Sequence, residues 1–279
     1  MSSSEPPVTD HFITINGLNI HYRDWGDRQL SPLVILHGFD AHSHSWDKVV
    51  AALADRFRVI VPDLRGNGES SWAPDYTWEL MVEDILGLMN ALGLSKTVLC
   101  GHSMGGRFGY MLASRYPERV IRLVNVEAYP WDPKVPTGDP PAYTDSYDTI
   151  EEAAIEAYKR QPYADKESLR HEIEHGLKLR EDGRWTWRMD PALRIASWLG
   201  KLNPGTQLEW PALTQLQCPW VLVYGVHSFG KRGFAEDIAR RIPHCELIEI
   251  PDAEHDLPNE NPREFIRALH AYLTKVPAP

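Results

Sequence analysis

The pentapeptide Gly101-His102-Ser103-Met104-Gly105 has the G-x-S-x-G pattern in which a serine acts as a nucleophile. It follows an apolar segment, residues 97–100, that favours a strand, and it opens a segment with helical spacing. A tight turn between the two would hold Ser103 in a strained backbone conformation that requires small neighbours. It would also present the hydroxyl at a helix amino terminus, where N–H groups favour developing negative charge. Alone, the pattern would favour a serine that only caps a helix.

A second turn, His37-Gly38-Phe39, follows the apolar segment 33–36. It could aim a backbone N–H group at the oxygen of the carbonyl that the serine attacks. When a serine attacks a carbonyl carbon, the carbonyl oxygen becomes an oxyanion, which backbone N–H groups can stabilise. The backbone N–H groups of Phe39 and Met104 are the expected donors of this oxyanion hole. An ordinary turn at the end of a strand is the alternative interpretation of His37-Gly38.

A serine hydroxyl is a weak nucleophile near neutral pH unless a base accepts its proton. The sequence predicts that His255, in the loop after the apolar segment 246–250, is this base. Because the carboxyl ends of parallel strands meet at one edge of a sheet, this loop would approach the same edge as Ser103. The other eleven of the 12 histidines are expected to be mostly surface or packing residues.

Apolar segments alternate with segments of helical spacing along most of the chain. Continuous apolar runs suit strands that are covered on both faces, and the alternation predicts an α/β fold with a mostly parallel sheet flanked by helices. Two segments that flank Gly17 predict an antiparallel edge hairpin. The predicted strands are residues 12–16, 19–25, 33–36, 58–61, 97–100, 121–126, 220–224 and 246–250, and the predicted helices are residues 46–56, 78–92, 104–116, 234–242 and 262–273.

The alternation stops between about residues 129 and 211, where a proline-rich stretch precedes helical segments at 150–160 and 166–180. We expect residues 129–211 to form an inserted helical cap on a core domain made of residues 1–128 and 212–279. Aromatic residues are frequent in this region. They would either line a pocket for a hydrophobic group or form the cap's own small core.

Composition excludes several classes of partner. The 29 Lys and Arg residues against 39 Asp and Glu residues give a formal net charge of −10, which argues against nucleic-acid binding. No apolar run approaches the roughly 20 residues needed to cross a bilayer, so no membrane partner is expected. Residues 1–7 lack the pattern of a secretory signal, so the cytoplasm is the expected location.

The three cysteines are expected to be reduced core thiols. His42 and His44 have no carboxylate or cysteine at a metal-ligand spacing, so no metal is predicted.

Taken together, these motifs resemble the α/β-hydrolase fold superfamily from about residue 12 to residue 273. The resemblance implies that superfamily's fold with a helical cap, and a catalytic serine, acid and histidine in this chain order. It says less about the substrate, because the fold hosts many activities. The motifs that carry the resemblance are His37-Gly38-Phe39, residues 63–70, residues 101–106, residues 116–120, and His255 followed by Glu260-Asn261-Pro262.

The acid departs from the usual pattern of the superfamily. Its members commonly carry the acid after the penultimate strand as Gly-x-x-Asp, whereas this chain has Gly225-Val226-His227-Ser228, and a serine cannot supply a carboxylate. Some relatives, including haloalkane dehalogenases and certain lactone hydrolases, carry the acid one strand earlier, where this chain has Glu127. The resemblance therefore implies that Glu127 orients His255. Alternatively, Glu127 forms a salt bridge at the cap hinge and the acid lies elsewhere or is missing.

The expected activity is hydrolysis of a small, hydrophobic carboxylic ester or lactone through an acyl-enzyme, without a cofactor. Epoxide hydrolases and haloalkane dehalogenases use an aspartate nucleophile, so Ser103 argues against both mechanisms. Hydrolysis of a carbon–carbon bond in a diketone is one alternative, since similar triads perform it. A ligand sensor with slow turnover is another, because Ser228 replaces the usual aspartate.

Overall fold

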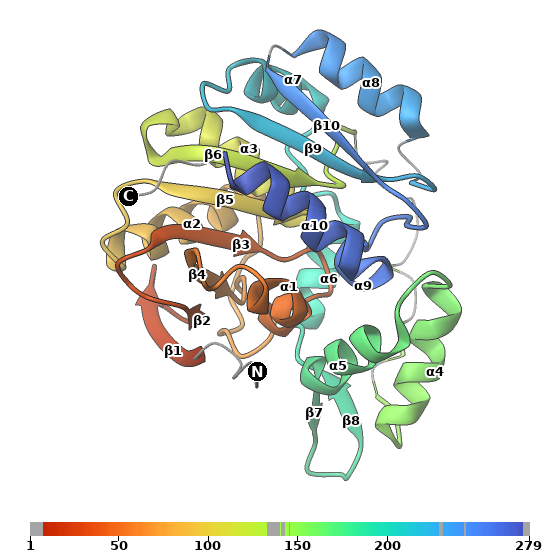
Figure 1. The fold of residues 1–279 in the computed structure, drawn as a ribbon. Coiled ribbons are helices and arrows are strands. Elements are labelled where there is room, and N and C mark those ends of the chain that lie inside the picture. The colour runs from red at the N-terminus through yellow and green to blue at the C-terminus, as the bar shows by residue number, and fades with distance from the viewer. Residues whose placement is uncertain are drawn as a thin grey trace.

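A computed structural model describes residues 8–132, 140, 143–144, 146–228, 231–242 and 244–275. An eight-stranded sheet with the strand order β1-β2-β4-β3-β5-β6-β9-β10 forms its centre (Figure 1). Only the pairs β1–β2 and β2–β4 are antiparallel, and all other neighbouring strands in this sheet are parallel. The predicted α/β class with a mostly parallel sheet is therefore confirmed. The strands are β1 (Val8–Ile15), β2 (Leu18–Trp25), β3 (Ser31–Leu36), β4 (Phe57–Pro62), β5 (Thr97–His102), β6 (Val120–Val126), β9 (Trp220–Gly225) and β10 (Cys245–Ile250).

Helices cover both faces of this sheet. Residues of α1, α9 and α10 pack in one apolar cluster with the sheet, whereas α2, α3 and α8 contribute to a cluster on the other face. In Figure 1, α1 and α10 lie in front of the sheet and α2 and α3 lie behind it. The helices are η1 (Ser43–Trp46), α1 (Asp47–Ala51), α2 (Trp78–Ala91), α3 (Met104–Arg115), η2 (Pro117–Arg119), α8 (Lys231–Arg241), α9 (Leu257–Glu260) and α10 (Pro262–Leu273).

The interior strands are nearly continuous apolar runs because both of their faces are buried. In β3, for example, every residue from Leu33 to Leu36 is 0% exposed. The predicted hairpin joins β1 to β2 through Asn16 and Gly17, both with positive φ (50° and 79°), as a tight hairpin turn requires. The predicted strands therefore correspond to observed ones, most of them extended by one to a few residues.

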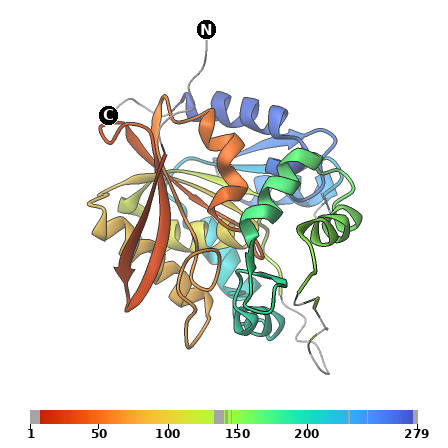
Figure 2. The same cartoon turned by 90° about the horizontal axis from the view of Figure 1, so that it is seen from below.

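The chain between β6 and β9 contributes a second group of elements, which we call the insertion. Its described elements are α4 (Ile150–Arg160), α5 (Lys166–Gly176), β7 (Leu177–Leu179), β8 (Trp185–Trp187), α6 (Pro191–Trp198) and α7 (Thr206–Thr214). Viewed from below, α5 lies beside α1, with α4 on its far side (Figure 2). None of the described helices of the protein is long and apolar enough to cross a membrane.

The insertion packs in two different ways. The elements α4, α5 and β7 share a small apolar cluster that is separate from the clusters on the sheet. By contrast, α6 and α7 contribute to the same cluster as α2 and α3. We propose residues 129–211 as the cap, and we expect its separately packed part, from Tyr147 to Trp187, to move most easily. Residues 133–139, 141–142 and 145 of this range lie outside the described residues.

Two helix predictions are wrong at their ends. The segment 46–56 is α-helical only over α1, and the chain then turns into β4. The segment 166–180 stops being helical at Gly176, whose added Cβ would lie 3.0 Å from Nε2 of His42. After this close approach, β7 pairs with β8 as an antiparallel hairpin. The close approach to His42 explains the end of α5, whereas local turn bonds such as Leu53 N–H to Val50 O follow α1.

Glu209 links α7 to α3, and its removal should destabilise the fold. It is 0% exposed, its Oε1 lies 3.4 Å from Nε of Arg107, and it accepts a hydrogen bond from the hydroxyl of Tyr110. Because its removal would leave Arg107 without its carboxylate partner, Glu209→Ala should lower the free energy of unfolding by about 3 kcal/mol. Urea denaturation measures this change. The exposed Glu83→Ala control should stay within about 0.5 kcal/mol of the wild type, and an equally small effect at Glu209 would contradict the prediction.

Candidate active site

Four neighbouring parallel strands carry the groups of the candidate site at their carboxyl ends. In the sheet order β5-β6-β9-β10, Ser103 follows β5 and Glu127 follows β6. The loops after β9 and β10 bring Ser228 and His255 to the same edge. Residues that are more than a hundred positions apart thus meet because the strands that precede them are adjacent.

Ser103 occupies the sharp turn between β5 and α3. Its backbone has φ 50° and ψ −114°, a strained conformation for a residue with a side chain. The turn also brings α3 against the end of β3, since a Cβ at Gly105 would lie 2.5 Å from the carbonyl oxygens of both Leu36 and His37. Only glycine fits there. The turn exposes the serine hydroxyl at the amino terminus of α3.

His255 lies between the serine and the acid. Its Nε2 is 3.1 Å from Oγ of Ser103, and its Nδ1 is 3.4 Å from Oε2 of Glu127. When Nδ1–H points at the carboxylate, Nε2 carries a lone pair and can accept the proton of the serine hydroxyl. The structure therefore brings together the three residues named from the sequence, in the order that nucleophilic catalysis requires.

The carboxylate of Glu127 is buried and held by several donors. Its side chain is 0% exposed, and its Oε1 accepts hydrogen bonds from the backbone N–H of Gly225 at 2.7 Å and the hydroxyl of Tyr129 at 3.1 Å. Its Oε2 accepts a hydrogen bond from Oγ of Ser228 at 2.7 Å. Burial and the nearby carboxylate raise the pKa of Tyr129, which keeps this hydroxyl a donor. These bonds offset the cost of removing the carboxylate from water.

Ser228 has a role that the sequence did not reveal. It stands where the superfamily commonly carries its acid, and here its hydroxyl binds the carboxylate that comes from the neighbouring strand instead. In the sequence, the Gly-x-x-Ser pattern indicates only that the usual acid is absent from this position. The hydrogen bond depends on the adjacency of β6 and β9, which a single sequence does not state.

His102 is a second residue that the sequence did not single out. Its Nε2 donates a hydrogen bond to the backbone carbonyl of His255 at 2.7 Å, and burial lowers its pKa to about 3. A Cβ at Gly38 would lie 2.8 Å from its Nδ1, so His102 fills the space between the two turns. His102 is therefore neutral, and its hydrogen bond holds the loop that carries His255. Its place beside the serine in G-x-S-x-G was the available signal.

The two predicted oxyanion donors lie at the appropriate turns. Met104 is the first residue of α3, so its N–H has no acceptor within the helix. Phe39 lines a cavity together with Ser103. The turn before Phe39 is fixed by His37, whose Nε2 accepts the N–H of Leu64 at 2.9 Å and whose Nδ1 donates to the carbonyl of Gly38 at 2.8 Å. The assignment of the oxyanion hole to Phe39 and Met104 stays a prediction.

A cavity of about 350 Å³ lies in front of the serine, between the core and the insertion. One part of its wall is apolar, formed by Phe39, Trp46, Leu169, Ile173, Trp187 and Pro258. Another part carries Asp40, Arg160, Glu172 and Asp256. Burial raises the pKa of both Glu172 and Asp256, and Nδ2 of Asn259 donates a hydrogen bond to each carboxyl group.

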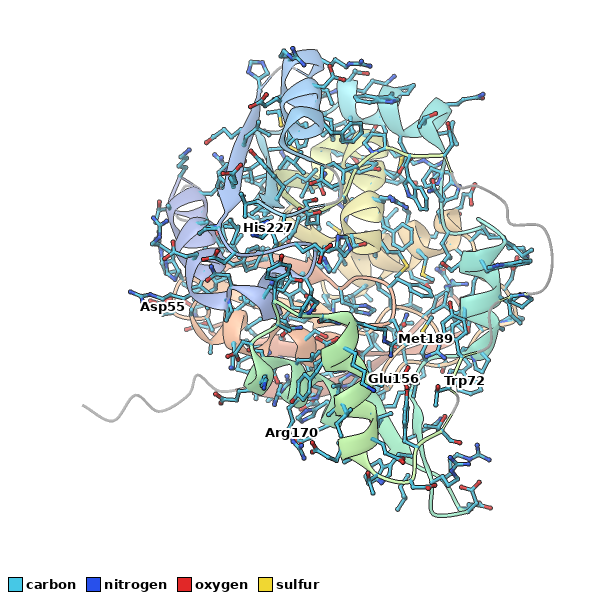
Figure 3. The ribbon with its side chains drawn as sticks, turned by 90° about the vertical axis from the view of Figure 1, so that its right-hand side faces the viewer. Asp55, Trp72, Glu156, Arg170, Met189 and His227 are labelled. Carbon is cyan, nitrogen blue, oxygen red and sulfur yellow. The ribbon has the colours of Figure 1, made fainter. Side chains whose placement is uncertain are left out.

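Among the described aromatic residues between positions 129 and 211, Trp187 lines this cavity and most of the others do not. Others, including Tyr147 and Trp185, pack in or against the insertion's own apolar cluster. Tyr163 stacks on His227, in the loop after β9, with ring centroids 5.0 Å apart. Figure 3 shows His227 above the insertion, with Glu156 on α4 and Arg170 on α5 below it. The insertion therefore touches the core at the active edge of the sheet.

Comparison with known proteins places these features in a family. The family model described as alpha/beta hydrolase fold matches residues 31–262. A mouse (Mus musculus) sn-1-specific diacylglycerol lipase is 28% identical to this protein, and the match covers 89% of this chain and 82% of the lipase chain. A pig (Sus scrofa) bifunctional epoxide hydrolase is 30% identical over 84% of this chain, which spans 41% of that protein.

Among solved structures, a thioesterase domain from the curacin biosynthetic pathway has a TM-score of 0.84 to this protein. It is 21% identical, and the match covers 95% of this chain and 99% of that one. At this identity, the likeness concerns the fold alone. The family match covers most of the chain, including the serine turn and the histidine loop. The chain therefore belongs to the family of hydrolases that share the alpha/beta hydrolase fold.

Proposed function

We propose that the protein is a serine hydrolase that cleaves a carboxylic ester or lactone through an acyl-enzyme. The observation that carries the proposal is the 3.1 Å contact between Oγ of Ser103 and Nε2 of His255, with Ser103 held at a strained turn. A serine that merely caps a helix would need neither a histidine base nor this backbone conformation. The mouse lipase supports the same reaction class, because lipases cleave carboxylic esters.

The first half of the reaction transfers the acyl group to the enzyme. Oγ of Ser103 attacks the carbonyl carbon while Nε2 of His255 accepts the hydroxyl proton. The N–H groups of Phe39 and Met104 stabilise the oxyanion, and Glu127 stabilises the imidazolium through Nδ1–H. The tetrahedral intermediate then collapses, the bond to the alkoxide breaks, and His255 returns the proton to the leaving oxygen.

The second half releases the acid. Water takes the place of the alcohol, His255 accepts one of its protons, and the hydroxide attacks the acyl carbon. Collapse of the second tetrahedral intermediate breaks the bond to Oγ, which recovers its proton from His255. In a lactone, the alcohol and the acid stay joined, so a hydroxy acid leaves.

The cavity favours a substrate with an apolar part and a polar part. Leu169, Ile173 and Trp187 would contact the apolar part, whereas Arg160 and the carboxyl groups would face hydrogen-bonding atoms. The nucleophile is a serine, which favours an ester over the epoxide that the pig relative's name indicates for that protein. Small-molecule hydrolysis in the cytoplasm is thus the function we propose.

Labelling with a fluorophosphonate, combined with burst kinetics on a chromogenic acetyl ester, tests the proposal. We expect one equivalent of label on Ser103, identified by peptide mass spectrometry, and a burst of about one equivalent of alcohol followed by sustained turnover. Label on another residue would contradict the mechanism. Turnover of a diketone but not of esters would indicate a carbon–carbon hydrolase, and labelling without sustained turnover would indicate a sensor.

A further inference from the structure

Three histidines converge at the boundary between the core and the insertion. His44 lies on η1 of the core, whereas His171 and His175 lie one turn apart on the same face of α5. One ring nitrogen of each lies within 4.8 Å of those of the other two. The ring of His175 has its centroid 3.9 Å from that of His44 and 4.3 Å from that of His171. None of the three lines the cavity in front of Ser103.

Hydrogen bonds fix which nitrogen of each ring carries a proton. One oxygen of Asp47, Oδ2, accepts from Nδ1 of His44 and from Nε2 of His171, both at 2.9 Å. Nδ1 of His175 donates to the backbone carbonyl of His171 at 2.9 Å. Because a carboxylate and a carbonyl only accept, each of these ring nitrogens is the donor. In the neutral imidazoles, the opposite nitrogen of each ring then carries a lone pair.

This arrangement matches the way in which proteins prepare histidine for a metal. A ligating imidazole commonly donates its second N–H to a carboxylate or a backbone carbonyl, which fixes the tautomer and the ring orientation. Asp47 does this for two of the rings, and a backbone carbonyl does it for the third. Asp47 is itself paired with Arg23, so its position is also held from the core side.

We propose that His44, His171 and His175 bind a divalent transition-metal ion of the zinc class, with Asp47 as the positioning residue. Imidazole nitrogen suits Zn²⁺, Ni²⁺ and Cu²⁺, whereas Mg²⁺ and Ca²⁺ prefer oxygen ligands. Ligands in a tetrahedral zinc site lie roughly 3.3 Å apart, as follows from Zn–N bonds of about 2.0–2.1 Å. One nitrogen of each ring lies within 4.8 Å of the others, and the rings of His44 and His175 are stacked, so the rings must turn about their side-chain bonds to direct one nitrogen each at the ion.

A bound ion would join the core to the insertion. The elements that carry the three histidines also line the cavity, through Ser45 and Trp46 at η1 and Glu172 and Ile173 on α5. Nε2 of His42 already donates to the carbonyl of Glu172 at 2.8 Å, so η1 and α5 touch without a metal. The ion would add a second link at the same contact and hold α5 in its place over the cavity.

The sequence did not predict this site, because the expectation of no metal rested on the neighbours of His42 and His44. The spacing of His171 and His175 was the available signal, since residues four apart share a helix face. Their partner His44 lies 127 positions before His171, in a part of the chain that only the fold brings near. No local sequence pattern connects His44 with the two histidines of α5.

Isothermal titration of the untagged, EDTA-dialysed protein with ZnCl₂ tests the proposal without any substrate, so it is independent of the proposed hydrolysis. The wild type should bind one equivalent, and zinc at about 100 times its Kd should raise the Tm by roughly 5 °C. His171→Gln and His175→Gln should abolish this binding. Asp47→Asn should weaken it by about 10- to 100-fold.

The exposed His244→Asn is the matched control, because it removes a histidine at the opposite, amino-terminal edge of β10 and should leave zinc binding unchanged. Circular dichroism checks that each variant is folded. As a second readout, Co²⁺ should give visible absorption bands of a four-coordinate site in the wild type and not in the two glutamine variants. A wild type without a stoichiometric zinc site, or glutamine variants that bind zinc as tightly as the wild type, would overturn the proposal.

Discussion

Ser103→Ala should lower kcat for ester hydrolysis by about 10⁶-fold, the loss that removal of a serine nucleophile causes in a comparable triad. The variant keeps the oxyanion donors and the binding cavity, so a residual rate of about 10³- to 10⁴-fold above that in water should remain. Steady-state kinetics with a chromogenic ester measures the loss. Because alanine retains Cβ, the backbone strain at φ 50° is unchanged and the fold should be preserved.

Ser103→Gly provides a matched control for this result. Glycine adopts a positive φ without strain, so this variant should be as inactive as alanine but more stable by roughly 1 kcal/mol. Thermal unfolding of the two variants separates the strain at the turn from the loss of the hydroxyl. Wild-type turnover in either variant would mean that Ser103 is not the nucleophile.

The fold was predictable to the extent that it depends on local apolar patterns. The interior strands are buried on both faces, so continuous apolar runs such as residues 33–36 predict them from the sequence. The serine turn was predictable for a similar reason, since its glycines and its position between a strand and a helix are local. The short hairpin of β7 and β8 was missed because three-residue strands leave too little pattern.

The supporting residues of the site could not be predicted in this way. Ser228 and His102 act through hydrogen bonds to residues on other strands or loops, at sequence separations of 101 and 153. Such contacts depend on strand order, which local patterns do not encode. Glu127 could be predicted as the acid only because the superfamily has a second position for this residue. The residues proposed to act directly were thus easier to predict than those that hold them in place.

Glu127→Gln should lower kcat by about 10⁴-fold, as expected when the histidine of a triad loses its orienting carboxylate. The amide can still accept the N–H of Gly225 through its oxygen. Its NH₂ group, however, would donate to Nδ1 of His255 and leave the proton on Nε2, which is the wrong tautomer for a base. Kinetics with the ester substrate measures the loss. Unaltered turnover would show that the acid lies elsewhere.

Adding Ser228→Asp to Glu127→Gln should restore part of the activity, because Oγ of Ser228 lies 2.7 Å from the carboxylate oxygen that faces His255. A carboxylate from position 228 would reach Nδ1–H from the neighbouring strand, and we expect kcat to rise about 10²-fold over the single variant. The matched Glu127→Gln with Ser228→Asn has the same size without the charge and should show no recovery. In the wild type, Ser228→Asp would instead place two carboxylates together and should lower both stability and activity. If the double variant with aspartate is no faster than that with asparagine, the carboxylate's charge is not what orients His255.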